Sequence, residues 1–418
     1  MIELAKKYFK IHRSITGKGV RKSLKLLKQE IPNLRIKKIK SGNKVFDWKI
    51  PAEWNIKEAY IADKNAKKII DFKNNNLHII NYSTSINKFL SRQKLLKHLF
   101  FEKSKPNAIP YMTSYYKKFW GFCVSYNDFK SKFNKKKYKV VINSKFNKKG
   151  FLNYGELIIK GKSKKEIIIH TYICHPGLAN NETSGPIVCT YLAKYFQKKK
   201  NNYTLRFIFT PETIGSIAYI YKNYKSLKDN VIGGYVITCV GDEKNYSICE
   251  SKEKQSLSNK IAKEVFAKNK IKFKTFSYLE RGSDERQYNS PGIDLSIASI
   301  MRTKHGEFKE YHTSDDNFNL VSKIGLIGSF KIIKKIISEF DKKIIPFAKI
   351  KCEPFMTKRN LYDSLSTGRV DNYTRDLMNF LAYSDGTKDI KEIGKIINVN
   401  NEKIKKIYNI LKINRLVN

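Results

Sequence analysis

The sequence predicts an α/β protein whose central sheet is mainly parallel and covered by helices on both faces. From residue 150 onward, short apolar runs typical of strands alternate with stretches in which apolar residues recur at helical spacing. Such alternation produces parallel strands joined by helices. The residues before and after this region differ from it in pattern, and a chain of 418 residues is long enough for two or three hydrophobic cores.

The alternating pattern sets the expected order of elements in the central domain. Its first strand is expected at residues 166–170, and the following helix at 184–199 places Val188, Leu192 and Phe196 on one face. Ligands of such sheets bind beyond the carboxyl ends of the strands, so a site is expected at this edge. Further strands are expected at 205–210, 235–240 and 295–299, and further helices at 216–224, 256–269 and 324–340.

Three other regions flank or interrupt the central domain, which we assign to residues 151–345. Residues 1–44 are assigned to that domain as its N-terminal helical part, with residues 2–31 predicted to be helical around a turn at 13–19. Residues 45–150 contain short β-like runs separated by proline-containing loops, which predicts an inserted β-rich domain. Residues 355–418 carry three helical stretches, an Asp-Gly turn and a short final strand, the pattern of a winged helix. Winged helices contact DNA or protein, and the pattern does not separate the two.

Charge and cysteine content restrict the compartment and the partners. The formal net charge is +46, but the lysines are spread along the whole chain among many Asn and Ile residues, which is typical of drift toward AT-rich codons. Nucleic acid is therefore the less expected partner, and a homo-oligomer stays open. No apolar run approaches the roughly 20 residues of a membrane span, the first residues lack a signal-peptide core, and the six cysteines form no CxxC pair. We expect a cytoplasmic protein with free thiols.

Polar and ionisable residues gather where the predicted strands end. His175 lies in a loop just before a helix, Glu212 follows an apolar strand, and His312 lies in the segment after the last strand. A metal site without cysteine pairs needs this convergence of imidazole and carboxylate groups. Glu212 is placed either to bind the metal or to take a proton from a metal-bound water. The segments involved are IIIHTYICHPGLANNETSG (167–185), FIFTPETIGS (207–216), RGSDERQYNSPGID (281–294) and EYHTSDDN (310–317).

Neighbouring residues are predicted to contact the substrate. Asp284 and Glu285 form an acidic pair in a loop rich in Gly and Ser, which suits a substrate amine, and Asp284 is alternatively placed to orient a metal-bound histidine. Arg286 can hold a carboxylate or another anion through two hydrogen bonds. Asn181 and Tyr311 adjoin the predicted metal-binding residues and complete the expected substrate site.

At these residues the sequence resembles two known groups. SDERQYNSPGID, YHTSDDN, PETIGS and HPGLANNETSG are similar to the metal-binding segments of co-catalytic zinc aminopeptidases, and this resemblance spans roughly residues 150–340. Over nearly the whole chain, RSITGKGVR, VFDWKIPAEWNI and YYKKFWGFC also resemble an uncharacterised bacterial family. Its members have an aminopeptidase-like domain, an inserted β module and a C-terminal winged helix. The resemblance implies a zinc-exopeptidase-like fold for the central domain of this chain.

The chain departs from the zinc aminopeptidases at the residues that would hold a second metal ion. Asn181 stands where they have a metal-bridging aspartate, Glu182 follows it, and only Glu212 remains of a pair of glutamates. Neutral side chains compensate two dications poorly. The resemblance therefore implies one Zn²⁺, held by His175, Glu182 and His312 with an open position for water, and Glu212 as the base. The opposite assignment, with Glu212 as ligand and Glu182 not, stays open.

The function implied by this resemblance is zinc-dependent hydrolysis of aminopeptidase type. Zinc would polarise the carbonyl of a peptide bond, or of an N-acylated small molecule, and lower the pKa of its bound water to about 7. Two alternatives remain. One is a non-catalytic protein that uses the cleft to bind a ligand or partner in surface-polysaccharide biosynthesis. The other is a regulator that binds nucleic acid through its winged helix.

Overall fold

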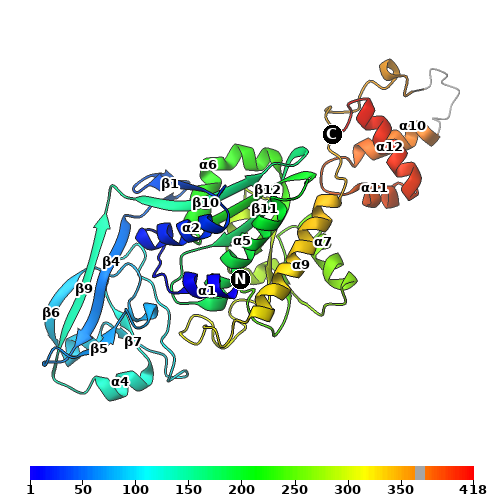
Figure 1. Cartoon of the computed structure of the whole chain (residues 1–418). Coiled ribbons are helices and arrows are strands. Elements are labelled where there is room, and N and C mark those ends of the chain that lie inside the picture. The colour runs from blue at the N-terminus through cyan, green and yellow to red at the C-terminus, as the bar shows by residue number, and fades with distance from the viewer. Residues whose placement is uncertain (363–371) are drawn as a thin grey trace.

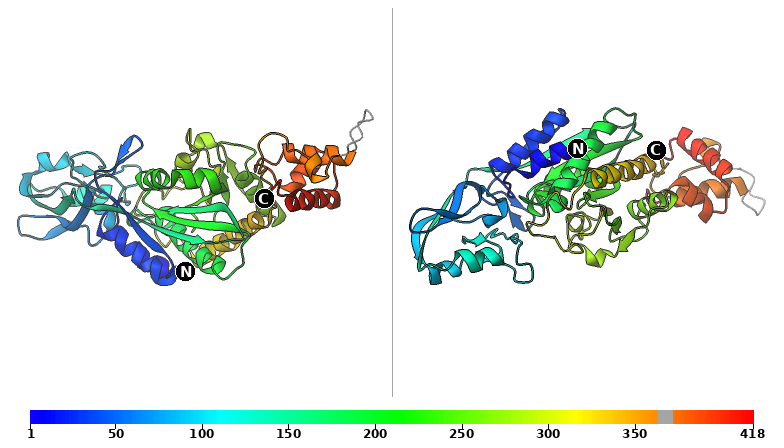
Figure 2. Two further views of the ribbon diagram at one scale, coloured as in Figure 1. Left: turned by 90° about the horizontal axis from the view of Figure 1, so that it is seen from above. Right: turned by 60° about the horizontal axis from the view of Figure 1, so that its bottom comes forward.

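The computed structural model describes residues 1–362 and 372–418, which form an elongated molecule with its largest sheet in the middle (Figure 1). A β-rich module lies at one end and the C-terminal helices lie at the other (Figure 2). Residues 363–371, which fall within the region predicted as a winged helix, lie outside the described residues. The central domain lies between the β-rich module and the C-terminal helices and contacts both.

The central sheet has eight strands and a parallel centre. In spatial order the strands are β1 (Arg35–Lys40), β10 (Phe151–Ile159), β12 (Tyr203–Thr210), β11 (Ser163–Tyr172), β13 (Val231–Ile237), β16 (Ile297–Met301), β14 (Ser247–Cys249) and β15 (Lys274–Phe276). The four strands from β12 to β16 are parallel to one another. The pairs β1–β10, β10–β12 and β14–β16 are antiparallel and extend the sheet at both sides. The predicted parallel sheet is confirmed, with antiparallel additions that the sequence did not predict.

Helices cover both faces of this sheet, as predicted. One face carries α1 (Ile2–Phe9), α2 (Lys18–Glu30), α5 (Ser184–Phe196), α7 (Leu257–Lys268) and α9 (Lys323–Lys342), and the other carries α6 (Ile214–Asn230) and α8 (Glu285–Tyr288). Successive residues of a strand point to opposite faces. In β11, Ile167 and Ile169 pack in the cluster of the first face, whereas Ile168 packs in the cluster of the second. Burial on both faces explains why the central strands are almost wholly apolar.

The β-rich module interrupts the chain before β10 and has a hydrophobic cluster of its own. Its main sheet is antiparallel and runs β5 (Lys68–Asp71), β4 (Glu53–Ala62), β9 (Lys137–Asn147) and β6 (Ile86–Ser91). Smaller elements complete it: β2 (Lys44–Val45), β3 (Trp48–Lys49), η1 (Asn76–His78), α3 (Arg92–Leu96), β7 (Leu99–Phe100), β8 (Phe122–Cys123) and α4 (Tyr126–Lys132).

The C-terminal part contains three helices with their own apolar cluster, α10 (Asn372–Ala382), α11 (Ile390–Ile396) and α12 (Asn401–Ile413). Ala348 and Val417 form an antiparallel bridge that joins the end of the chain to the segment following α9. Two ion pairs connect this part to the central domain. Lys343 lies 2.9 Å from Asp389, and Lys260 lies 2.6 Å from Glu392 of α11. In the described parts of the chain, no helix is both long and apolar enough to span a membrane. Three further short helices are η2 (Ala179–Thr183), η3 (Tyr278–Glu280) and η4 (Thr357–Arg359).

Candidate functional site

Loops that follow parallel strands meet at one edge of the central sheet. β11 ends at Tyr172 and leads into His175, and β12 ends at Thr210 and leads into Glu212. His312 lies in the long segment between β16 and α9. Because these strands are parallel, their carboxyl ends lie side by side and bring the three side chains into one cluster, which is called the pocket below.

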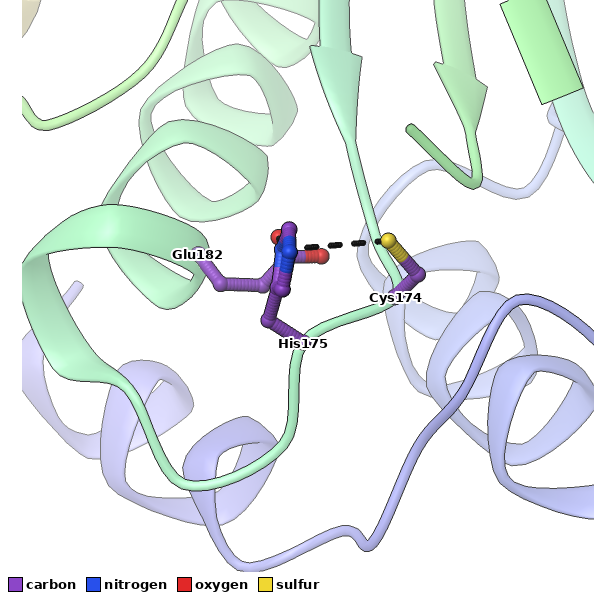
Figure 3. Close-up of side chains that lie close together, drawn as sticks. All are labelled: Cys174, His175 and Glu182. Atoms are coloured by element: carbon purple, nitrogen blue, oxygen red, sulfur yellow. Dashed lines mark hydrogen bonds and ion pairs between the residues drawn. The ribbon is translucent and has the colours of Figure 1, made fainter. Parts of the chain in front are cut away.

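His175 is the centre of this pocket, because both of its ring nitrogens face an acidic side chain. Its Nδ1 lies 2.5 Å from Oε2 of Glu182, and its Nε2 lies 3.5 Å from Oε2 of Glu212. The Sγ of Cys174 lies 3.8 Å from the same Nδ1. Figure 3 shows the thiol directed at the imidazole ring and the Glu182 carboxylate beside that ring. His175 and Glu182 are both buried.

His312 lies beside His175 and completes the pocket together with two tyrosines. The centroids of the two imidazole rings are 5.6 Å apart. Tyr311 stacks on the ring of His312 at 3.9 Å. Tyr111, from the β-rich module, presents a ring roughly perpendicular to both imidazoles, 4.9 Å from His175 and 5.2 Å from His312. The module therefore supplies one wall of a pocket that otherwise belongs to the central domain.

The electrostatics of the pocket differ between its two histidines. Burial alone lowers the pKa of His175, but the neighbouring Cys174 and Glu182 raise it well above the usual value. Burial and the nearby His175 lower the pKa of His312 to about 3, so this imidazole is neutral at physiological pH. Burial also raises the pKa of Glu212, against the opposing effect of His175 and Arg286. A carboxylate with a raised pKa is suited to accepting and returning a proton.

The loop that carries His175 and Glu182 is fixed by two buried charged residues from distant segments. Arg13, which is fully buried, donates to the backbone carbonyl of His175 at 2.8 Å. Asp316, also fully buried, accepts the backbone N–H groups of Asn180 at 2.5 Å and of the next residue at 2.9 Å. These contacts replace the regular hydrogen bonds that a long loop lacks. Asp316 thereby ties the loop to the segment that carries His312.

The predicted substrate-binding residues of the 281–294 loop surround the turn after β12. Asp284 accepts the backbone N–H of Thr213 at 2.8 Å, and Arg286 donates to the Thr213 hydroxyl at 2.7 Å. Burial and the nearby Glu212 raise the pKa of Asp284 well above its usual value. Glu285 is fully buried and accepts hydrogen bonds from two backbone N–H groups of its own loop and from the Ser299 hydroxyl. The hydrogen bonds of the Glu285 carboxylate thus hold its own loop and Ser299 in place.

Asn181 lies on a neutral side of the pocket. Its Oδ1 accepts the Tyr172 hydroxyl at 3.0 Å, and that hydroxyl lies 2.6 Å from Oγ1 of Thr238. The Asn181 backbone carbonyl accepts the Thr238 hydroxyl at 3.0 Å. The oxygens of these uncharged residues bond to one another, whereas the buried Nδ2 of Asn181 has no hydrogen-bond partner among the described residues. The side chains of Asn181, Tyr172 and Thr238 supply no negative charge for a cation.

The donor atoms around His175 fit a bound cation. One ligand atom each from Cys174, His175 and Glu182 lie within 4.8 Å of one another, and all three residues are buried. Glu182 is fully buried, and its Oε1 has no hydrogen-bond partner among the described residues. A buried carboxylate oxygen without a partner costs free energy that a bound cation would offset.

Sequence reasoning missed three residues that shape this pocket. Cys174 was expected to be an ordinary buried thiol, although it directly precedes the key histidine; the described residues do contain six free cysteines, of which only Cys352 is exposed. Arg13 lies in a motif that marks the family resemblance but gives no hint of its partner. Tyr111 comes from the inserted module, and nothing in its local sequence indicates contact with His175.

Comparison with known proteins places the chain in a family. Residues 2–343 match the family described as "Domain of unknown function (DUF4910)", and residues 345–418 match a winged helix-turn-helix. A candidate polysaccharide biosynthesis protein with an aminopeptidase-like domain, from Clostridium acetobutylicum, is 40% identical over 394 residues, covering 93% of this chain and 89% of that protein.

Solved structures agree with this placement. The crystal structure of a candidate peptidase from Clostridium acetobutylicum has a TM-score of 0.81 and 37% identity, covering 100% of this chain and 95% of that one. A zinc aminopeptidase from Bacillus subtilis has a TM-score of 0.59 and 14% identity, covering 81% of this chain and 94% of the other, which shows a shared fold. The chain belongs to the DUF4910 family, and it combines an aminopeptidase-like fold with a C-terminal winged helix.

Proposed function

We propose that this chain is a zinc-dependent hydrolase of aminopeptidase type that cleaves a peptide bond or the amide bond of an N-acylated small molecule. The observation that carries the proposal is the setting of His175, which lies between two carboxylates and beside His312 at the carboxyl edge of an aminopeptidase-like sheet. Imidazole and carboxylate groups in this combination are the ligands of catalytic zinc sites.

One Zn²⁺ would be held by His175, Glu182 and His312, leaving a position open. Such an ion supplies a Lewis acid and lowers the pKa of a bound water to about 7. Glu212 would accept the proton of the attacking water and return it to the leaving amine, which suits its raised pKa. Burial lowers the pKa of His312, which keeps its imidazole neutral for binding, whereas a metal ion at His175 would have to displace the proton that this ring shares with Glu182.

The short contact between Glu182 and Nδ1 also fits the exchanged assignment of the two glutamates. In that arrangement Glu182 accepts the Nδ1–H and orients the ring, as carboxylates commonly do beside metal-bound histidines, while Glu212 binds the ion on the Nε2 side. The two arrangements predict opposite behaviour of the Glu182 and Glu212 variants toward zinc. Measuring both variants therefore separates them.

A single ion rather than a pair is proposed because of the neutral side of the pocket. A second dication would need a carboxylate at the side chain of Asn181, where the groups are an amide, a tyrosine hydroxyl and a threonine hydroxyl. Asp316 lies near the backbone of Asn181, but its two oxygens accept the backbone N–H groups of Asn180 and Asn181. Without that negative charge two adjacent dications repel each other strongly.

Substrate would enter a pocket lined by tyrosines and by Arg286. Tyr111 and Tyr311 form aromatic walls on either side of His312. Arg286 contacts the turn of Glu212 through one nitrogen, and its Nε has no hydrogen-bond partner among the described residues. We propose that Arg286 and Asp284 orient polar groups of the substrate next to the bond that is cleaved.

The test combines metal analysis with the Glu212→Gln variant. Protein purified without chelators should contain about one zinc per chain, and the variant should retain the zinc while losing about 10²- to 10⁴-fold in hydrolysis of an amide substrate. Full activity of Glu212→Gln would remove the proposed base. Loss of zinc from this variant, with retention in Glu182→Gln, would establish the exchanged assignment.

The competing function is ligand binding without turnover. It is favoured by the neutral groups on the Asn181 side, and the relative named for polysaccharide biosynthesis suggests a saccharide as the ligand. This function predicts that added zinc does not raise the melting temperature, whereas a ligand that binds only the folded state does. Stabilisation by an N-acylated sugar without stabilisation by zinc and without release of the acyl group would therefore favour ligand binding over hydrolysis.

A further inference from the structure

We infer that Cys174, in place of His312, is the third ligand of the metal ion, so that the ion is bound on the Nδ1 side of His175 by sulfur, nitrogen and oxygen and a fourth position stays open for water. This inference rests on the proposed zinc function. It starts from the three side chains in Figure 3, whose donor atoms lie within 4.8 Å of one another. Residues 174 and 175 are consecutive, so the loop leaving β11 presents two donors at once.

The distances agree with a common ion except at one pair of atoms. Zinc–sulfur bonds of about 2.3 Å and zinc–nitrogen bonds of about 2.0–2.1 Å place two tetrahedral ligand atoms about 3.5 Å apart. The Sγ of Cys174 is 3.8 Å from Nδ1 of His175. Nδ1 and Oε2 of Glu182 are 2.5 Å apart, a hydrogen-bond distance. A cation that replaces the shared proton must separate this pair by about 1 Å.

The partners of the remaining atoms are consistent with this arrangement. The backbone N–H of Glu212 donates to the Sγ of Cys174 at 3.2 Å, a bond that stabilises negative charge on sulfur. Coordination through Nδ1 leaves the proton of His175 on Nε2, which faces the Glu212 carboxylate at 3.5 Å. The buried Oε1 of Glu182, which lacks a partner among the described residues, provides a second oxygen toward the ion.

Binding in this mode has a defined proton balance. The metal ion displaces the thiol proton of Cys174 and the Nδ1 proton that His175 shares with Glu182, and both are released to solvent. No oxidation or reduction takes place. The resulting site carries two negative ligands, which neutralise one dication and leave no charge for a second.

The experiment uses Co²⁺ as the probe and a Cys352→Ser background, which removes the exposed thiol. The expected result is a thiolate-to-cobalt charge-transfer absorption in the near ultraviolet. Cys174→Ser should abolish this band and weaken cobalt binding at least about 10-fold. The matched control is Cys189→Ser, because Cys189 is equally buried but lies within α5, where it belongs to the apolar cluster of the central domain.

The outcomes separate this inference from the proposed function. Cobalt bound without the sulfur band overturns the role of Cys174 and leaves the metal site intact. Absence of any bound cobalt or zinc overturns both. If Cys174→Ser does not fold, X-ray absorption at the zinc edge of the background protein decides instead, because sulfur at about 2.3 Å supports the inference and nitrogen or oxygen alone at about 2.0–2.1 Å overturns it.

Discussion

The pocket has a charged side and a neutral side, and the two are built from neighbouring residues of the short helix η2. Glu182 belongs to the charged side, where it faces His175 and carries a buried oxygen without a partner. Asn181 belongs to the neutral side, where Tyr172 and Thr238 satisfy its side-chain oxygen and its backbone carbonyl. The unpartnered atom of the charged side is an oxygen of Glu182, which can bind a cation, whereas that of the neutral side is Nδ2 of Asn181, a donor that cannot. Two adjacent residues thus differ in role, because Glu182 is placed to bind a cation whereas Asn181 supports the surrounding structure.

The largest expected effect comes from Asp316, which holds both sides in place. Asp316→Ala leaves the backbone N–H groups of two buried asparagines without an acceptor and should lower the free energy of unfolding by about 2–4 kcal/mol. Denaturant titration measures this loss. The control is Asp315→Ala, because Asp315 is the adjacent residue and is exposed. Equal stability of the two variants would show that the clamp does not fix the loop.

Acid should lower the free energy of unfolding through His170, a buried histidine of β11 that lies next to Thr210 and Asp284. Burial lowers the pKa of His170 to about 3, below the value of about 6.5 in an unfolded chain. The unfolded state therefore binds the proton first. The contribution of His170 to stability is complete above pH 6.5 and is lost as the pH falls toward 3, reaching a loss of about 2–3 kcal/mol at pH 4.5.

Unfolding measured between pH 7.5 and pH 4.5 tests this contribution. His170→Gln, which cannot titrate and keeps a hydrogen-bonding side chain near Thr210, should flatten the acid limb of the curve. An unchanged slope in this variant would assign the acid sensitivity to other groups.

A carboxylate introduced on the neutral side of the pocket should raise the affinity for zinc. Asn181→Asp keeps the shape of the side chain and the bond from the Tyr172 hydroxyl, while adding a carboxylate within the pocket. Zinc affinity should rise about 10-fold, which corresponds to about 1.4 kcal/mol, and calorimetric titration measures it. Weaker zinc binding by Asn181→Asp would show that the proposed ion lies out of reach of this residue.

The smallest effect is expected at Tyr172. Tyr172→Phe removes a hydroxyl that bonds to Asn181 and Thr238 and should cost about 0.5–1.5 kcal/mol of stability, without changing zinc affinity. Thermal unfolding with and without zinc measures both quantities. A large loss of zinc binding would contradict the division of the pocket into two sides.

The fold was predictable where burial imposes a pattern. The strand expected at 205–210 is observed as β12, Tyr203–Thr210, and the helix expected at 184–199 is observed as α5, because apolar side chains on these elements report their surroundings directly. β1 was not predicted. Its sequence, RIKKIK, is rich in lysine because it lies at the edge of the sheet, where solvent reaches most of its side chains.

The site was predictable only in the parts that follow strands. His175 and Glu212 can be located because a polar residue directly after a buried strand is unusual, and parallel strands end at the same edge. Arg13 and Tyr111 reach the same pocket from segments 162 and 64 positions before His175, and a single sequence carries no signal for such contacts. Neutral Asn181 was identified through its departure from the aminopeptidase pattern rather than through its own chemistry.

Tyr111 and its neighbours connect the β-rich module directly to the pocket. The backbone N–H of Tyr111 bonds to the carbonyl of His312 at 2.8 Å, and Ile109 and Ser314 exchange two more hydrogen bonds of 2.9 Å. A tilt of the module would pull the segment carrying His312 with it. The module is therefore not structurally independent of the pocket. A substitution far out on its antiparallel sheet can shift the segment that carries His312, so we expect the two parts to change together in evolution.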